Sequence, residues 1–88
     1  MSAVQETSEA LIVGETPLSA EVRETVLDRA VAEQAAEGWA LETNPDVEQV
    51  LVGHNKFRRA LVRRQWGIRT VRELVDVDKQ GNISIRHT

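Results

Sequence analysis

The pair Gly38-Trp39 marks the point where the sequence changes from a helical pattern to a strand pattern. Glycine adopts the left-handed backbone conformation that ends a helix at no steric cost, so the chain can reverse direction at Gly38. From Trp39 to Thr43 the side chains alternate with the two-residue period of a half-buried strand. The sequence therefore predicts that a helix ends near residue 37 and that a strand covers residues 39–43.

The residues that follow predict the return strand of a hairpin. Asn44-Pro45-Asp46 has the composition of a tight turn, because proline presets φ at the second turn position and asparagine can bond the backbone ahead of it. The run from Glu48 to Gly53 contains Val50-Leu51-Val52, and such a continuous apolar run suits a strand covered on both faces. We expect residues 39–43 and 48–53 to pair.

The helix before Gly38 has a clear start signal in Thr16-Pro17-Leu18-Ser19. Ser19 is the expected N-cap, and Glu21 falls in the first turn, where the helix dipole stabilises an anion. The helix is predicted to run to about Glu37 and to bury a broad apolar arc against a sheet or a second helix. The arc consists of Ala20, Val22, Val26, Leu27, Ala30, Val31, Ala35 and Ala36.

Two further strands are predicted near the end of the sequence, over residues 70–78 and 82–87. Val75 and Val77 on the first strand face Ile83 and Ile85 on the second across the connecting loop. Gly81 stands where a hairpin loop of three to five residues requires a left-handed residue. These two segments are therefore expected to form a well-specified hairpin.

The segment between the two hairpins, residues 56–69, has no clean period. A helix would group Phe57, Ala60 and Leu61 but would place Arg64 in the same sector. A strand would place arginines on the same face as its apolar residues. We therefore predict a short helix or an irregular basic connection here.

These elements predict an α+β fold with one main N-terminal helix packed on a small antiparallel sheet of about four strands. We expect residues 17–88 to form this single domain and residues 1–16 to form a flexible acidic N-terminal segment. Within that segment, the apolar run Ala10–Val13 either adds an edge strand or docks on a partner.

Charge is segregated along the chain. Residues 1–53 carry eleven acidic side chains against two arginines, whereas residues 54–88 carry nine basic side chains against three acidic ones. The acidic helix and the basic connection therefore offer complementary surfaces.

The chain has no cysteine, which excludes disulfides and thiolate zinc sites and favours a cytoplasmic location. No apolar run approaches the ~20 residues that cross a bilayer, so we expect no transmembrane segment.

No residue pattern matches a catalytic, cofactor or metal site. His54 and His87 lack a third ligand at metal spacing. Glu42, Asp46 and Glu48 bring carboxylates near one turn without the spacing of a calcium loop. The glycines form no phosphate-binding pattern. We therefore predict neither enzyme activity nor a cofactor.

The segments TPLSAEVRETVLDRAVAEQAAEGWALETNPDVEQVLVGHN and VRELVDVDKQGNISI resemble small uncharacterised proteins of actinobacteria and their phages. In those proteins a helix ends in a Gly-Trp pair, and a hairpin that ends in an apolar run follows. A hydrophobic membrane hairpin comes next, and a Val-Asp-x-x-Gly-Asn strand pair closes the chain. This sequence has KFRRALVRRQWGIRT in place of the membrane hairpin, and its arginines exclude it from hydrocarbon. The resemblance implies a soluble relative and implies no activity.

Two main functions remain open, and adhesion of the basic segment to an anionic membrane surface is a third possibility. One is a protein-interaction module that acts on a host protein or self-associates as a homodimer or larger homo-oligomer. The other is nucleic-acid binding through the basic segment, with aromatic side chains available for stacking. Trp39 is expected in the core, whereas Trp66 is either core or an exposed anchor at an interface. The expected partner-binding residues are Lys56, Phe57, Arg58, Arg59, Arg63, Arg64, Trp66 and Arg69.

Overall fold

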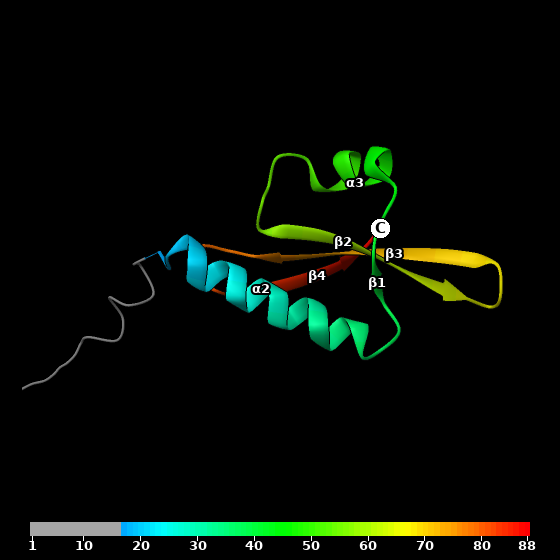
Figure 1. The fold of residues 1–88 in the computed structure, drawn as a ribbon, viewed down its shortest axis with the longest axis horizontal. Helices are drawn as coiled ribbons and strands as arrows, with labels where there is room; N and C mark the ends of the chain where they lie inside the picture. The colour runs from blue at the N-terminus through cyan, green and yellow to red at the C-terminus, as the bar shows by residue number, and fades with distance from the viewer. Residues whose placement is uncertain (1–16) are drawn as a thin grey trace, which may run out of the picture.

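A computed structural model describes residues 17–88 of the chain, so the predicted Ala10–Val13 strand lies outside the described residues. Figure 1 shows one helix on each side of a four-stranded antiparallel sheet, in which the strand order follows the chain order β1-β2-β3-β4. This arrangement confirms the α+β class and the main N-terminal helix. The helices are α2 (Ala20–Ala35) and α3 (Pro45–Val52), and the strands are β1 (Ala40–Leu41), β2 (Arg58–Gln65), β3 (Arg69–Val77) and β4 (Ile83–His87).

Helix α2 begins as the sequence predicts. The Ser19 side chain accepts a hydrogen bond from the backbone N–H of Val22 at 3.2 Å, and Glu21 lies in the first turn. The helix ends at Ala35, slightly before the expected end, and Gly38 takes a φ of +96°. The expected apolar arc is wider than the buried face, because only Leu27 and Ala30 are buried.

The β3–β4 hairpin has the predicted pairing. Val75 lies opposite Ile85 and Val77 lies opposite Ile83. Gly81 in the connecting loop has a φ of +88°, and a Cβ added there would come within 2.7 Å of the Leu18 side chain. The positive φ favours glycine at this position, and a larger residue would in addition have to displace the end of the Leu18 side chain.

The prediction of a strand over residues 48–53 is wrong, because Pro45–Val52 forms helix α3. Pro45 occupies the first helical turn, and the Asn44 side chain accepts a hydrogen bond from the N–H of Asp46 at 3.1 Å. An Asn-Pro-Asp sequence fits a helix start as well as a tight turn, since proline's fixed φ suits both. The expected 39–43 strand shortens to β1, which pairs with β2.

The prediction of a short helix or irregular connection over residues 56–69 is also wrong, because β2 is an inner strand between β1 and β3. It pairs with β3 from Arg58 opposite Asp76 to Gln65 opposite Arg69. Ala60 and Leu61 are both 1% exposed. Because adjacent strand residues point to opposite faces, β2 is covered on both faces at this point, which removes the alternation expected of a strand.

The core lies between α2 and the sheet. It contains Trp39, as predicted, and the cluster consists of Leu27, Ala30, Trp39, Leu61, Val75 and Val77. Glu73 on β3 is also buried, at 1% exposure. The Gln34 side-chain amide donates to one Glu73 carboxylate oxygen at 2.5 Å, and His87 Nε2 lies 3.5 Å from the other. The buried carboxylate therefore has polar partners from α2 and β4.

Candidate interaction surface

The far end of the β2–β3 hairpin projects beyond both helices (Figure 1). Its last pair is Gln65 with Arg69, and Trp66, Gly67 and Ile68 form the turn. Trp66 is 83% exposed and Ile68 is 90% exposed. Two large, exposed apolar residues thus lie two positions apart at the apex of a projecting hairpin, away from the core.

The turn holds the Trp66 backbone in an uncommon conformation. Trp66 has a φ of +54° and Gly67 a φ of +81°. In hairpin turns, positions with positive φ are normally taken by glycine, asparagine or aspartate. For a bulky residue this conformation costs roughly 1–2 kcal/mol. The hairpin therefore presents the indole at its apex at a cost in conformational energy.

Arginines surround the two apolar side chains. Arg64 and Arg69 are exposed, and the Arg64 guanidinium donates to the carbonyl of Gly67 at 3.3 Å. Within residues 17–88, neither has a carboxylate oxygen within 4.0 Å of its guanidinium. We define the hairpin tip as Arg64, Trp66, Gly67, Ile68 and Arg69. It combines an apolar centre with a cationic rim.

One further predicted partner-binding residue, Arg63, lies on this hairpin behind the tip. The Arg63 guanidinium lies over the Trp39 ring, 4.5 Å from its centroid, and donates to the Glu37 carbonyl at 3.3 Å. Arg63 and Arg64 also line a recess of about 510 Å³ together with Gly38, Ala40, Val62 and Thr70.

The other half of the predicted site lies at the opposite end of β2, about 23 Å away at ~3.3 Å per strand residue. Phe57 is 9% exposed, with the Arg23 guanidinium 3.8 Å from its ring centroid. Arg58 pairs with Asp76 at 3.0 Å. Arg59 donates to the backbone carbonyls of Lys56 and Arg58 at 2.8 and 2.9 Å.

The structure therefore divides the predicted segment into an exposed tip and an internally paired base. Ile68 is the residue that the sequence analysis missed. The sequence feature that could have revealed it is the neighbouring Gly67. Once residues 58–65 are recognised as a strand, Gly67 marks a hairpin turn, and Ile68 belongs to that turn.

Neither a metal centre nor a membrane helix emerges from the part of the chain that the structure describes. Residues 17–88 contain no group of three or more metal-ligating side chains that could hold an ion. No helix among these residues is both long enough and apolar enough to cross a bilayer. Comparison with protein-family models, curated proteins and solved structures finds no match to this chain. The resemblance to small actinobacterial proteins therefore stays a prediction.

Proposed function

We propose that this protein is a small protein-interaction module that contacts its partner through the hairpin tip. The observation that carries the proposal is the exposure of Trp66 and Ile68, at 83% and 90%, at the apex of a strained turn. Single exposed apolar residues are ordinary on protein surfaces. Two such residues within one three-residue turn have the character of a binding anchor, because tryptophan is among the residues most enriched at interface hot spots.

The surroundings of the pair define the chemistry of the partner. Trp66 and Ile68 need an apolar recess to remove them from water, whereas Arg64 and Arg69 need acidic side chains around its edge. Arginine suits such a rim because its planar donors can bind a carboxylate through two hydrogen bonds. The expected partner is therefore a protein with an apolar pocket and an acidic border.

Affinity capture with matched variants tests this proposal. The test variant carries Trp66→Ser and Ile68→Ser, and the control carries Val50→Ser on α3, where Val50 is 82% exposed. We expect a protein that binds the wild type and the control but not the tip variant. For an identified partner, loss of a hot-spot residue should weaken binding by roughly thirtyfold or more. Equal capture by all three proteins would contradict the proposal.

A second copy of the chain is one partner that fits this description. Helix α2 exposes four acidic side chains that complement the cationic rim of the hairpin tip, namely Glu21, Glu24, Asp28 and Glu33. Sedimentation at increasing concentration should then show association that the tip variant and high salt both remove. A mass that stays monomeric at every concentration would leave a different protein as the partner.

Nucleic-acid binding is the second candidate function. It is supported by Arg63, Arg64 and Arg69 on one hairpin and by the exposed Trp66 ring, although the buried Phe57 ring is not available for stacking. Three phosphate contacts predict a salt dependence of log K with a slope of about −2 to −3. A low-salt gel shift with single- and double-stranded probes tests it, and unretarded probes would exclude it.

A further inference from the structure

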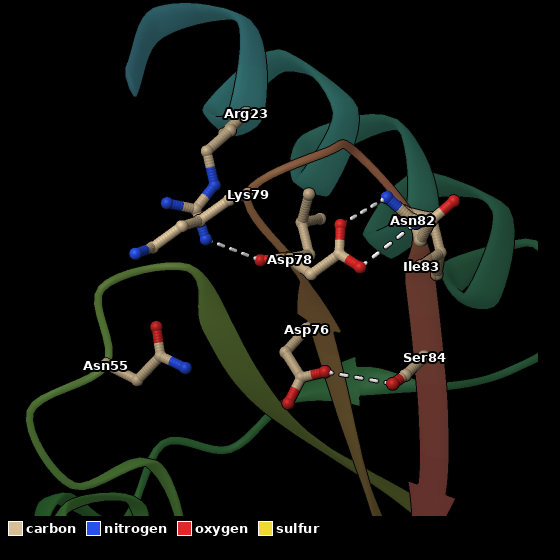
Figure 2. Close-up of a pocket in the computed structure, with 9 residues that line it drawn as sticks. Arg23, Asn55, Asp76, Asp78, Lys79, Asn82, Ile83 and Ser84 are labelled. Atoms are coloured by element: carbon tan, nitrogen blue, oxygen red, sulfur yellow. Dashed lines mark hydrogen bonds between the residues drawn. The ribbon is translucent and has the colours of Figure 1, made fainter. Parts of the chain in front are cut away.

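A cavity of about 300 Å³ is lined by the residues drawn in Figure 2. These residues lie around the β3–β4 turn, at the end of the sheet opposite the hairpin tip. It is bounded by the start of α2, the loop before β2 and the β3–β4 turn. Its charged and amide-bearing walls include Arg23, Asn55, Asp76, Asp78 and Lys79. The cavity is thus built from elements that are distant in sequence and shares no lining residue with the hairpin tip.

Both carboxylates in the wall are already occupied by other groups. Asp78 accepts hydrogen bonds from the backbone N–H groups of Asn82 and Gln80 at 2.8 and 2.9 Å, and from the Asn82 side chain at 3.0 Å. These hydrogen bonds hold the pKa of Asp78 below its usual range, and those from Asn82 have the largest effect. Figure 2 shows this carboxylate directed toward Asn82. Asp78 is therefore ionised but turned to its own loop.

Asp76 is engaged in the same way. One of its carboxylate oxygens accepts from Arg58 Nε at 3.0 Å, and the other accepts from the Ser84 hydroxyl at 3.2 Å. Arg86 lies 3.9 Å from the first oxygen. The partners of Asp76 thus come from β2 and β4, and they leave the cations of the cavity without a carboxylate.

The two cations of the cavity, Arg23 and Lys79, have no ion-pair partner within residues 17–88. Arg23 donates one terminal N–H to the carbonyl of Val77 at 2.7 Å and stacks on the Phe57 ring. Its Nε is buried and has no hydrogen-bond partner among the described residues. Because an unsatisfied buried donor is costly, this atom indicates a missing acceptor.

The side chains are arranged to meet such an acceptor. In Figure 2, Arg23 and Lys79 extend toward the same side of the cavity, and the Asn55 amide lies across from them. The stacking on Phe57 and the bond to Val77 fix the Arg23 guanidinium in advance. A preorganised cation loses little conformational freedom when it binds an anion.

We propose that this cavity binds a small phosphate-bearing anion, with Arg23 and Lys79 supplying the charge and Asn55 an additional amide donor. The two cations come from different elements, and a guanidinium offers several donors to the oxygens of a phosphate group. The volume accommodates a phosphate group with a small substituent, so inorganic phosphate and a phosphomonoester are the two sources of the same chemistry. This site is independent of the proposed function of the hairpin tip.

NMR titration of the full-length, ¹⁵N-labelled protein tests the inference. The probes are inorganic phosphate and glycerol phosphate, and sodium chloride at equal ionic strength is the reference. We expect saturable shifts at Arg23 Nε, the Lys79 amide and the Asn55 side-chain amide. If only inorganic phosphate gives saturable shifts, the site binds the free ion. If glycerol phosphate gives them too, the site also binds phosphomonoesters.

Three variants make the titration specific to the cavity. Arg23→Gln and Lys79→Gln should each weaken phosphate binding about tenfold or more, as expected for a charged hydrogen-bond partner. Lys79 is exposed, so its replacement leaves the fold intact even where loss of Arg23 does not. Arg29→Gln removes the same charge from the exposed side of α2 and should change affinity less than twofold. Shifts no larger than those in chloride, or equal weakening by Arg29→Gln, would overturn the proposal.

Discussion

The guanidinium of Arg63 lies over the indole of Trp39, with 4.5 Å between its central carbon and the ring centroid. His87 stacks on the same indole at a centroid distance of 5.9 Å and an interplanar angle of 18°. Trp39 is 5% exposed and belongs to the core cluster. Trp39 is therefore held between side chains of β2 and β4. Trp66, which lies on the same hairpin as Arg63, has no such cover and is exposed.

Replacing Trp39 should destabilise the protein strongly, whereas replacing Trp66 should leave its stability almost unchanged. Trp39→Ala removes a buried aromatic side chain and should lower the free energy of unfolding by about 3–5 kcal/mol. Trp66→Ala removes an exposed side chain and should change it by no more than about 0.5 kcal/mol. Urea denaturation of both variants measures this difference. A comparable loss in Trp66→Ala would show that the hairpin tip packs against the domain.

Gln34 is expected to contribute to stability through Glu73. Gln34→Leu leaves a buried carboxylate oxygen without its hydrogen-bond donor and should destabilise the protein by about 1–3 kcal/mol. Gln49→Leu makes the same chemical change at an exposed position of α3 and serves as the control. Thermal and urea unfolding of the two variants measure the effect. Equal stabilities would indicate that Glu73 reaches water when Gln34 is absent.

Asn44 should contribute to stability as the cap of α3. Asn44→Ala removes the acceptor for the Asp46 N–H and should cost about 1 kcal/mol. Hydrogen exchange at the amide of Glu48, which donates to the Asn44 carbonyl at 2.9 Å, reports on the first turn of the helix and should become faster. Strand-like carbon chemical shifts over residues 45–52 in the wild type would contradict a helix there.

The ion pair between Glu42 and Arg72 predicts a loss of stability in acid. The hydrogen bond from Arg72 Nε at 2.8 Å, followed by that from the Asn44 N–H, holds the pKa of Glu42 below its usual range. A carboxyl whose folded pKa is depressed contributes stability that is fully present above its unfolded pKa of about 4.3 and is lost as the pH falls through the folded pKa.

Arg72→Gln tests this dependence directly. The variant should raise the pKa of Glu42 toward that of an ordinary glutamate, because Arg72 is the largest cause of the depression. An NMR titration of the Glu42 carboxyl carbon measures both proteins, and Glu48, which lies outside the ion pair, provides an internal reference. The same Glu42 midpoint in both proteins would show that the pair does not persist in solution.

The parts of the fold that the sequence predicts correctly are those in which local chemistry and tertiary packing agree. Serine is a favourable N-cap residue, and Ser19 caps the exposed start of α2. Val75 and Val77 alternate with polar residues because the end of β3 has one face against α2, and Gly81 has the conformation that its loop requires. At these positions the local sequence pattern is compatible with only one type of secondary structure.

The parts that could not be predicted depend on the surroundings of the segment. Residues 58–65 lose their strand period because arginines take places beside buried residues: Arg58 pairs with Asp76, and Arg63 covers Trp39. Asn44-Pro45 fits a turn or a helix start, and in the structure it begins helix α3, which contacts β2. The exposed Trp66 and Ile68 could be recognised as a tip only after β2 and β3 were known to pair.

Fluorine NMR of the protein labelled with fluorotryptophan tests the central claim, that Trp66 at the hairpin tip contacts the partner. The chain contains two tryptophans, so the spectrum has two resonances, which Trp66→Phe assigns. In the free protein the Trp66 resonance should respond to solvent and that of Trp39 should not. Addition of the captured partner, or self-association at high concentration, should shift or broaden the Trp66 resonance and leave that of Trp39 unchanged. Binding that leaves the Trp66 resonance unaltered would contradict the account.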